Sequence, residues 1–143
     1  MSVDFNQSVI AEFRANHGRV GGMFEGAQLI LLTTTGARSG RSHTTPLGFL
    51  HDEGERLLVI GSAGGGPRHP DWYYNLRKHP RVTVETGVRA FDADAVVLTG
   101  SERDRIFAKA AADEPDWAEY ERRAGRRLPV VALHPVSGRP SAG

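Results

Sequence analysis

Cysteine is absent from this 143-residue sequence, and lysine is almost absent. Without cysteine, the chain has no disulfide partner, no thiolate catalysis and no Cys-based metal site. Lysine occurs only at Lys78 and Lys109, so arginine supplies nearly all of the 18 basic side chains. GC-rich coding would produce this bias. The planar guanidinium is also the better bidentate ligand for phosphate or carboxylate, and the two interpretations are compatible.

Long hydrophobic runs are also missing. The longest, residues 29–32, is far shorter than the roughly 20 residues of a membrane-spanning helix. The first residues, M-S-V-D-F-N-Q, have neither the basic nor the apolar region of a signal peptide, so we expect a cytoplasmic protein. A net charge of only +1 gives no indication of nucleic acid as a partner.

Several functional motifs are absent as well. The six histidines show no H-x-x-x-H or H-E-x-x-H spacing, so we expect no metal site. No G-x-S-x-G occurs, which leaves hydrolase chemistry without support. The sequence also has neither a Walker loop nor the G-x-G-x-x-G of a Rossmann domain.

What is present predicts one globular domain over residues 1–143, with residues 136–143 as a flexible tail. Hydrophobic residues make up 39% of the chain and the mean hydropathy is -0.38. Periodicity and breaker residues predict helices at 3–16, 70–79, 101–113 and 117–123, and strands at 27–34, 43–50, 56–62, 81–86, 88–98 and 129–133.

The spacing of these strands favours a mainly β fold with peripheral helices, namely a small six-stranded antiparallel barrel. Residues 50–56 and 86–88 leave no room for the crossover helices of a parallel sheet. Proline cannot donate a ladder hydrogen bond, so Pro46 predicts that strand 43–50 is an edge strand or bulges there.

The first stretch with chemical potential is residues 33–47, T-T-T-G-A-R-S-G-R-S-H-T-T-P-L. Gly36 and Gly40 bracket a turn that holds Arg38, Ser39 and Arg41. Exposed N–H groups, a hydroxyl and guanidinium groups together make a concavity for an anion. The alternative interpretation is an ordinary basic hairpin turn.

The second stretch is residues 61–76, G-S-A-G-G-G-P-R-H-P-D-W-Y-Y-N-L. Three consecutive glycines suit a backbone that approaches a ligand closely, or else a flexible surface loop. On the short helix that follows, Trp72 and Leu76 share a face and favour core packing. Asn75 beside the aromatic residues could hold the edge of a planar ring.

Four blocks resemble the deazaflavin-dependent nitroreductase family, the split-barrel oxidoreductases that use coenzyme F420. The blocks are L-L-T-T-T-G-A-R-S-G-R, T-P-L, G-S-A-G-G and H-P-D-W-Y-Y-N-L-R-K-H-P-R-V-T-V, and the resemblance covers about Phe5 to Pro135. It implies a split β-barrel, a deazaflavin cofactor, and hydride transfer to a small planar electron-poor acceptor such as a quinone, nitroaromatic or enone.

The resemblance also implies site residues. Those that would contact the cofactor are Ala37, Arg38, Ser39, His43, Thr44, Thr45, Pro46, Leu47, Gly48, Ile60, Gly61, Ser62, Ala63, Asp71, Trp72, Tyr73, Tyr74 and Asn75. Tyr120 falls near the place of a substrate-side tyrosine. The proton for the acceptor would come from Tyr120, Ser62 or water.

The chain departs from the family pattern at three of these positions. Family members often carry lysine where this chain has Ala63, and arginine where it has His43. Both differences reduce the fixed positive charge near the phosphate, and Arg41 and Arg68 are the nearby side chains that could compensate. Gly48 replaces a bulkier residue, which would widen the ring pocket.

Two other functions remain open on the sequence. The basic turn would serve the phosphate of FMN equally well in a flavin enzyme on a similar barrel. A non-catalytic cofactor carrier is the other alternative. A quinone acceptor would bring the protein close to a membrane surface, while the sequence leaves its oligomeric state open.

Overall fold

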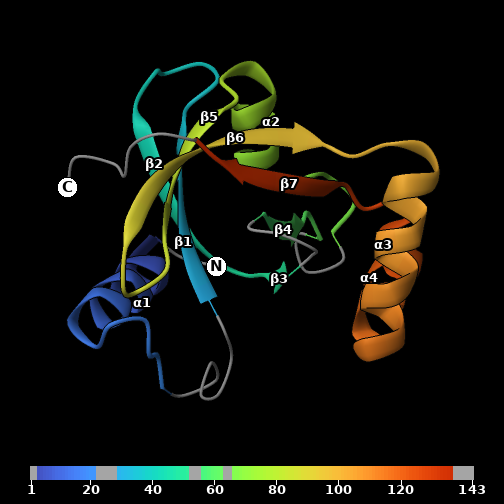
Figure 1. Ribbon diagram of the computed structural model, residues 1–143, viewed down its shortest axis with the longest axis horizontal. Coiled ribbons are helices and arrows are strands. Elements are labelled where there is room, and N and C mark those ends of the chain that lie inside the picture. Colours follow the sequence, from blue (N-terminus) through green and yellow to red (C-terminus); the bar gives the residue numbers. More distant parts are fainter. Residues whose placement is uncertain (1–2, 22–28, 52–55, 63–65, 137–143) are drawn as a thin grey trace.

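The computed structural model describes residues 3–21, 29–51, 56–62 and 66–136, and these residues form four helices and one antiparallel sheet (Figure 1). The helices are α1 (Val3–Ala15), α2 (Asp71–Lys78), α3 (Gly100–Asp113) and α4 (Asp116–Ala124). The strands are β1 (Leu29–Thr35), β2 (Ser42–Gly48), β3 (Leu50–His51), β4 (Leu57–Ile60), β5 (Arg81–Glu85), β6 (Ala90–Val97) and β7 (Val130–Pro135).

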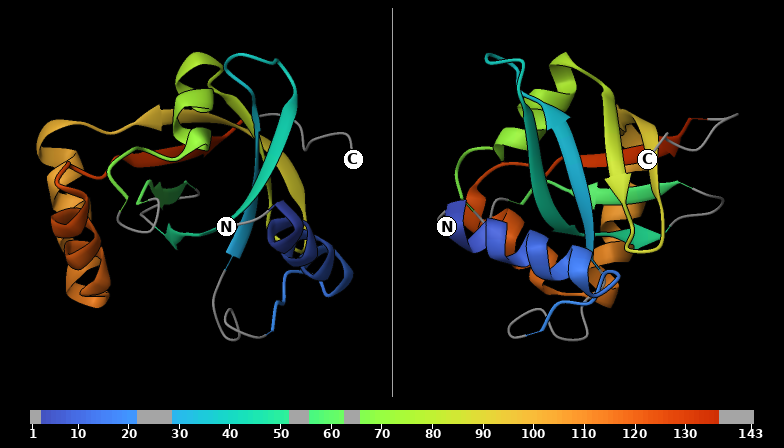
Figure 2. Two further views of the ribbon diagram at one scale, coloured as in Figure 1. Left: turned by 180° about the vertical axis from the view of Figure 1, so that it is seen from behind. Right: turned by 90° about the vertical axis from the view of Figure 1, so that its left-hand side faces the viewer.

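The sheet is strongly curled. Its strand order is β2-β1-β5-β6-β7-β4-β3, and every neighbouring pair is antiparallel. The two strands at opposite ends of this order, β2 and β3, are separated in the chain by Phe49 alone. The ends of the sheet must therefore lie close together, which bends it into an incomplete barrel (Figure 2).

The expected fold is confirmed, with one difference in the strands. Six main strands form the split barrel, but the strand expected at 43–50 is divided at Phe49 into β2 and the two-residue β3. The division lets one stretch of chain form both edges of the sheet. Pro46 faces Leu31 of β1 and lies on the outermost strand, so the prediction of an edge strand is also confirmed.

Strand β1 is buried on both faces, which explains its continuous apolar run. Ile30 and Leu32 point into the barrel interior, where Trp72 and Leu76 of α2 join the core. Residues of the opposite face, including Leu31, pack against α1. Because both faces of the strand are buried, its sequence does not alternate between apolar and polar residues.

The other side of the barrel repeats this arrangement. Leu57 and Val59 of β4 face the interior, whereas Leu58 and Ile60 pack against α3 and α4. Figures 1 and 2 show this helix pair at the end of the molecule away from α1. Among the described residues, every helix is too short or too polar to serve as a transmembrane segment.

The hairpin turn expected at 52–55, the central glycine-loop residues 63–65 and the tail residues 137–143 lie outside the described residues. The described helices agree with the sequence-based expectations to within one or two residues at each end. Gly125 caps the C-terminus of α4, and its φ of 66° is the left-handed conformation that favours glycine at this position.

Candidate functional site

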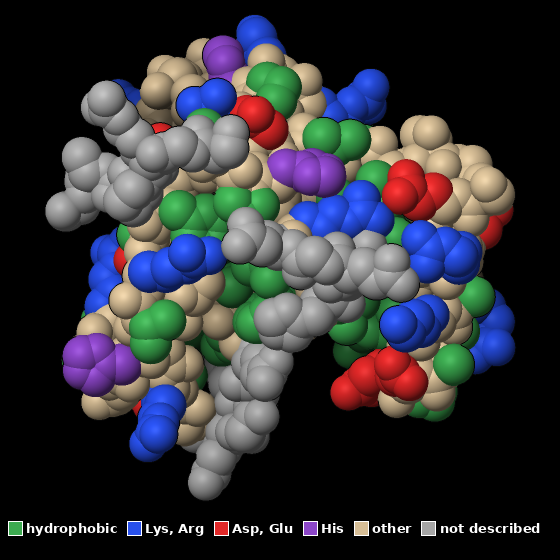
Figure 3. All heavy atoms as spheres, viewed as in Figure 1, with side chains coloured by type: hydrophobic (Ala, Val, Ile, Leu, Met, Phe, Trp, Pro, Cys, Tyr) green, Lys and Arg blue, Asp and Glu red, His purple; other side chains and the backbone are tan. Residues whose placement is uncertain are grey.

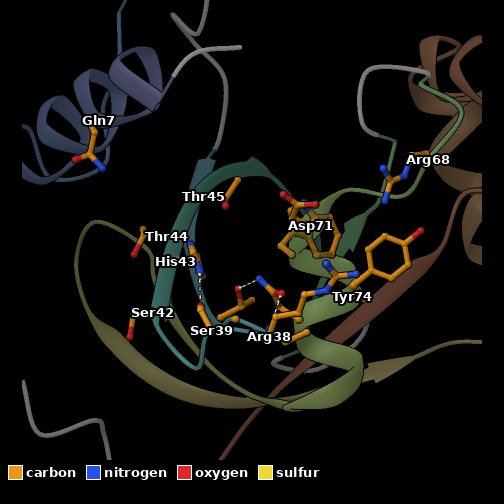
Figure 4. A pocket seen from close by; sticks show the side chains of 15 residues that line it. Gln7, Arg38, Ser39, Ser42, His43, Thr44, Thr45, Arg68, Asp71 and Tyr74 are labelled. Carbon is orange, nitrogen blue, oxygen red and sulfur yellow. Dashed lines mark hydrogen bonds between the residues drawn. The ribbon is translucent and has the colours of Figure 1, made fainter.

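A cavity of about 890 Å³ lies between α2 on one side and β2 with its preceding turn on the other (Figure 4). It therefore joins the two stretches that the sequence singled out. Its lining residues are Gln7, Thr34, Gly36, Ala37, Arg38, Ser39, Ser42, His43, Thr44, Thr45, Arg68, Asp71, Trp72, Tyr74 and Asn75. In Figure 4, Thr44 and Thr45 follow β2, whereas Asp71 and Tyr74 belong to α2.

Asn75 connects the two walls of the cavity. Its side-chain nitrogen donates to the Thr34 hydroxyl at 3.1 Å, and its side-chain oxygen accepts from the Ala37 N–H at 3.0 Å. Thr34 is only 2% exposed and Asn75 only 9%. The amide thus fixes the start of the basic turn to α2, and the Ala37 N–H already has a partner.

The turn itself leaves two N–H groups for a ligand. Gly36 donates to the Arg41 carbonyl at 2.8 Å, Gly40 donates to the Gly36 carbonyl at 3.0 Å, and Arg41 donates to the Ser39 hydroxyl at 3.1 Å. Within the described part of the chain, the N–H groups of Arg38 and Ser39 have no such partner. Unpaired N–H groups at a turn are the donors that an anion concavity requires.

Glycine at the start of this turn leaves room for two neighbouring side chains. A Cβ at Gly36 would lie 2.5 Å from the Ser39 hydroxyl and 2.9 Å from Nε2 of His43. The missing side chain lets the Ser39 hydroxyl and the His43 ring approach each other, at 3.5 Å. Gly36 therefore brings β2 and the turn together at the cavity wall.

The cavity carries more positive than negative charge. Neither Arg38 nor Arg68 has an ion pair or hydrogen bond from its side chain to any described residue. Asp71 is the one acidic side chain among the described residues that line the cavity. Figure 4 shows Arg38 extending from the turn toward Tyr74 of α2. Among the described residues, the cavity thus offers two guanidinium groups and two N–H groups without partners, which are donors suited to an anionic ligand.

Arg126 makes hydrogen bonds with residues that follow β4 and precede α2. Its side chain contacts residues 61–62, 66 and 68–69, including one contact of 2.8 Å to Nδ1 of His69. Burial, followed by the positive charges of Arg126 and Arg77, lowers the pKa of His69 below its ordinary value. The neutral imidazole is the form whose Nδ1 can accept this hydrogen bond.

Comparison with known proteins identifies the family. The family model described as F420H(2)-dependent quinone reductase matches residues 6–135, which is nearly the whole chain. The chain belongs to this family. It is therefore an oxidoreductase of a family that uses coenzyme F420, as the sequence blocks indicated.

Two curated relatives of this chain come from Mycobacterium tuberculosis. It is 34% identical over 127 residues to the F420H(2)-dependent quinone reductase Rv1261c of Mycobacterium tuberculosis, covering 86% of this chain and 85% of that protein. A putative F420H(2)-dependent quinone reductase of the same organism, Rv3178, is 28% identical over 106 residues, which is 74% of this chain and 88% of the relative.

Two solved structures are similar to this chain in both sequence and fold. An F420-H2 dependent reductase, FDR-A, is 35% identical with a TM-score of 0.66, covering 75% of this chain and 94% of its own. A structure titled as a domain-swapped dimer is 32% identical with a TM-score of 0.69, covering 92% and 96%. These likenesses agree with the split-barrel fold of this F420H(2)-dependent quinone reductase family member.

Ten of the residues expected to contact the cofactor line the cavity of this family member. They are Ala37, Arg38, Ser39, His43, Thr44, Thr45, Asp71, Trp72, Tyr74 and Asn75. Arg68, one of the two arginines expected to compensate for lost charge, also lines it, whereas Arg41 does not. The structure thus brings together the basic turn, β2 and α2 as one candidate site.

The other residues expected in the site are not among the lining residues, or lie outside the residues that the structure describes. Pro46, Leu47, Gly48, Ile60, Gly61, Ser62, Tyr73 and Tyr120 are not among the lining residues, and Ala63 lies outside the described residues. Tyr73 is buried in the barrel core beside Trp72. Tyr120 packs against the cluster beneath α3 and α4, with its ring 6.1 Å from that of Trp117. The roles expected for these residues stay predictions.

Sequence reasoning missed three lining residues: Gln7, Thr34 and Ser42. Thr34 and Ser42 lie on β1 and β2 beside residues that were expected. The alternation of side chains along each strand does not show which face of the strand lines the cavity. Gln7 lies on α1, whose position over the sheet depends on long-range packing. No local pattern in the sequence marks it.

Proposed function

We propose that this chain transfers a hydride from reduced coenzyme F420 to a small, planar, electron-poor acceptor of the quinone type. Nitroaromatics and enones are further candidate acceptors, since they share the same electronic character. The proposed site is the cavity between the basic turn and α2. A quinone dissolved in lipid would bring the protein to a membrane surface.

The observation that carries this proposal is the set of unpaired donors on residues that line the cavity. The guanidinium groups of Arg38 and Arg68 and the N–H groups of Arg38 and Ser39 have no partner among the described residues. Coenzyme F420 carries a phosphate and an acidic tail, which need such donors. The volume of about 890 Å³ lies within the range of roughly 300–1,000 Å³ typical of cofactor pockets.

Each part of the cavity has a proposed task. Arg38 and the adjacent N–H groups would hold the phosphate, and Arg68 would meet carboxylates of the tail. The hydroxyl groups of Thr44 and Thr45, half-buried along β2, would follow the cofactor. The aromatic residue Tyr74 would close the cavity from α2.

The bound deazaflavin would supply the hydride, because it has a carbon atom where a flavin has N5 and does not favour single-electron transfer. The protein needs only to bind, orient and exclude water, so no catalytic triad is required. We propose Ser62 or Tyr120 as proton donors to the acceptor. Since neither lines the cavity, water that enters through its opening is the third candidate.

A turnover assay tests the proposal. Purified protein is mixed anaerobically with reduced coenzyme F420 and a water-soluble quinone, and reoxidation of the coenzyme is followed by its absorbance. We expect protein-dependent, saturable reoxidation. Tight coenzyme binding without turnover across quinones, nitro compounds and enones would indicate a carrier. A protein that is yellow as purified and binds no deazaflavin would indicate an FMN enzyme.

A further inference from the structure

One guanidinium group, that of Arg126, makes hydrogen bonds to four backbone carbonyls and one histidine ring within residues 61–62 and 66–69. Its Nε donates to the carbonyl of Gly66 at 3.1 Å, and Nη1 donates to that of Gly61 at 3.2 Å. Nη2 donates to the carbonyls of Ser62 at 3.1 Å and Arg68 at 2.9 Å. With the bond from Nη1 to His69, all five N–H donors of the arginine side chain have an acceptor.

These contacts differ from those of the neighbouring arginines. Arg122, Arg123 and Arg127 form ion pairs with Glu119 or Asp104 on the surface of α3 and α4. Figure 3 shows basic and acidic side chains interspersed there. In contrast, no described carboxylate forms an ion pair with Arg126. Its positive charge is held by carbonyl dipoles and stays locally uncompensated.

The segment that Arg126 holds leads directly into the cavity. Residues 61 and 62 follow β4, and residues 66 to 69 precede α2. Arg68 lines the cavity, and its carbonyl is one of the acceptors. The His69 ring lies 4.7 Å from the Tyr73 ring and 5.8 Å from the Tyr74 ring, and Tyr74 also lines the cavity.

We propose that Arg126 is a positioning residue for the cofactor site: its guanidinium fork holds residues 61–62 and 66–69 so that Arg68 and Tyr74 face the anionic ligand. This inference rests on the proposed function of the cavity. Arg126 is not among the lining residues, so it acts through the backbone rather than on the ligand. A lysine could supply the charge but not five donors in a fixed planar arrangement.

The test compares Arg126→Lys and Arg126→Ala with the wild type, and uses Arg127→Ala as a matched control. Arg127 is the next residue, and its side chain pairs with Asp104 on the surface. Coenzyme F420 affinity is measured by fluorescence titration. We expect both Arg126 variants to bind about tenfold more weakly, as when the groups that support a binding residue are lost, and Arg127→Ala to match the wild type.

Guanidinium rescue separates positioning from general stability. Millimolar guanidinium, but not methylammonium, should restore coenzyme affinity in Arg126→Ala, because guanidinium alone reproduces the planar fork. If Arg126→Ala does not fold, Arg126→Lys decides the question. Wild-type affinity in Arg126→Lys would overturn the proposal, since charge alone would then suffice. Equal rescue by both cations would overturn it as well.

A second measurement is independent of the coenzyme. NMR of the wild type should show that neutral His69 carries its proton on Nε2, because Nδ1 accepts from Arg126. A proton on Nδ1 would contradict the contact on which the proposal depends. If the wild type fails to bind coenzyme F420, the proposed function fails. The His69 tautomer still tests the Arg126 contact in that case.

Discussion

Replacing Asn75 with alanine removes the connection between α2 and the basic turn. The Asn75 amide donates to the Thr34 hydroxyl at 3.1 Å and accepts from the Ala37 N–H at 3.0 Å. The hydroxyl is deeply buried, with Thr34 only 2% exposed, so water cannot readily take the place of the lost donor. The Ala37 N–H is half-buried and can regain part of its hydration.

The expected loss follows from these two environments. A typical hydrogen bond contributes about 0.5–1.5 kcal/mol, and a buried polar group left without a partner costs about 1–3 kcal/mol. The Thr34 hydroxyl incurs the larger cost and the Ala37 N–H the smaller one. We therefore expect Asn75→Ala to lower the free energy of unfolding by about 2–4 kcal/mol in the protein without cofactor.

Urea unfolding with linear extrapolation measures this loss. Thr34→Val removes the hydroxyl and keeps the shape, so a double-mutant cycle with Asn75→Ala should give a coupling energy of about 1 kcal/mol. Lys78→Ala, an exposed change on the same helix, should stay within about 0.5 kcal/mol of wild type. An Asn75→Ala loss no larger than that of Lys78→Ala, or strict additivity with Thr34→Val, would refute the reasoning.

Four further predictions concern other parts of the chain. Arg38→Ala should weaken coenzyme F420 binding by about 1–3 kcal/mol, as measured by calorimetry, whereas Arg41→Ala should not; equal effects would contradict this. Arg103→Ala should lower the free energy of unfolding by about 3 kcal/mol, because Arg103 is 7% exposed and ion-paired between α3 and α4; a loss under about 1 kcal/mol would show that the pair is not needed. Gly87→Ala should destabilise the protein by about 1–3 kcal/mol, since φ is 98° and a Cβ would lie 2.4 Å from a carbonyl oxygen; wild-type urea midpoints would contradict this. His69 has a lowered pKa when folded, so its contribution to the free energy of unfolding should be complete above its ordinary pKa and fall as the pH drops through the lowered value. Urea unfolding of His69→Gln should lack this fall, and the same fall in both proteins would contradict the prediction.

Much of the fold could be predicted from the sequence because its signals are local. The apolar run of β1 correctly predicted a buried strand, and the short spacing of the strands correctly predicted an antiparallel sheet. Pro46 correctly indicated an edge strand, since a missing N–H has the same consequence in any sheet. The break at Phe49 was missed, because it depends on how the sheet closes rather than on the residues beside it.

The candidate site was predicted less completely. The basic turn and α2 were recognised as two parts of one site, and the cavity between them supports that expectation. The internal partners of Asn75 could not be predicted, because they lie 38 and 41 residues away and depend on the packing of α2 against β1. Arg126 lies in a run rich in charged residues, 114–127, and only its contacts distinguish it from its neighbours.

Tyr120 illustrates what a resemblance can and cannot carry over. Its expected role came from sequence position alone. The structure places it in the cluster beneath α3 and α4, with Arg123 stacked over its ring at 5.9 Å. Its role as a proton donor stays a prediction, which the turnover of Tyr120→Phe would test directly.

The central claim is that the cavity between the basic turn and α2 binds coenzyme F420. Titration of the purified protein with the coenzyme, followed by fluorescence, tests it most directly. We predict a saturable change at micromolar concentrations that weakens as salt is added, since guanidinium groups would hold the anionic part. No fluorescence change at micromolar concentrations, or a change that Arg38→Ala leaves unaltered at every salt concentration, would contradict the account.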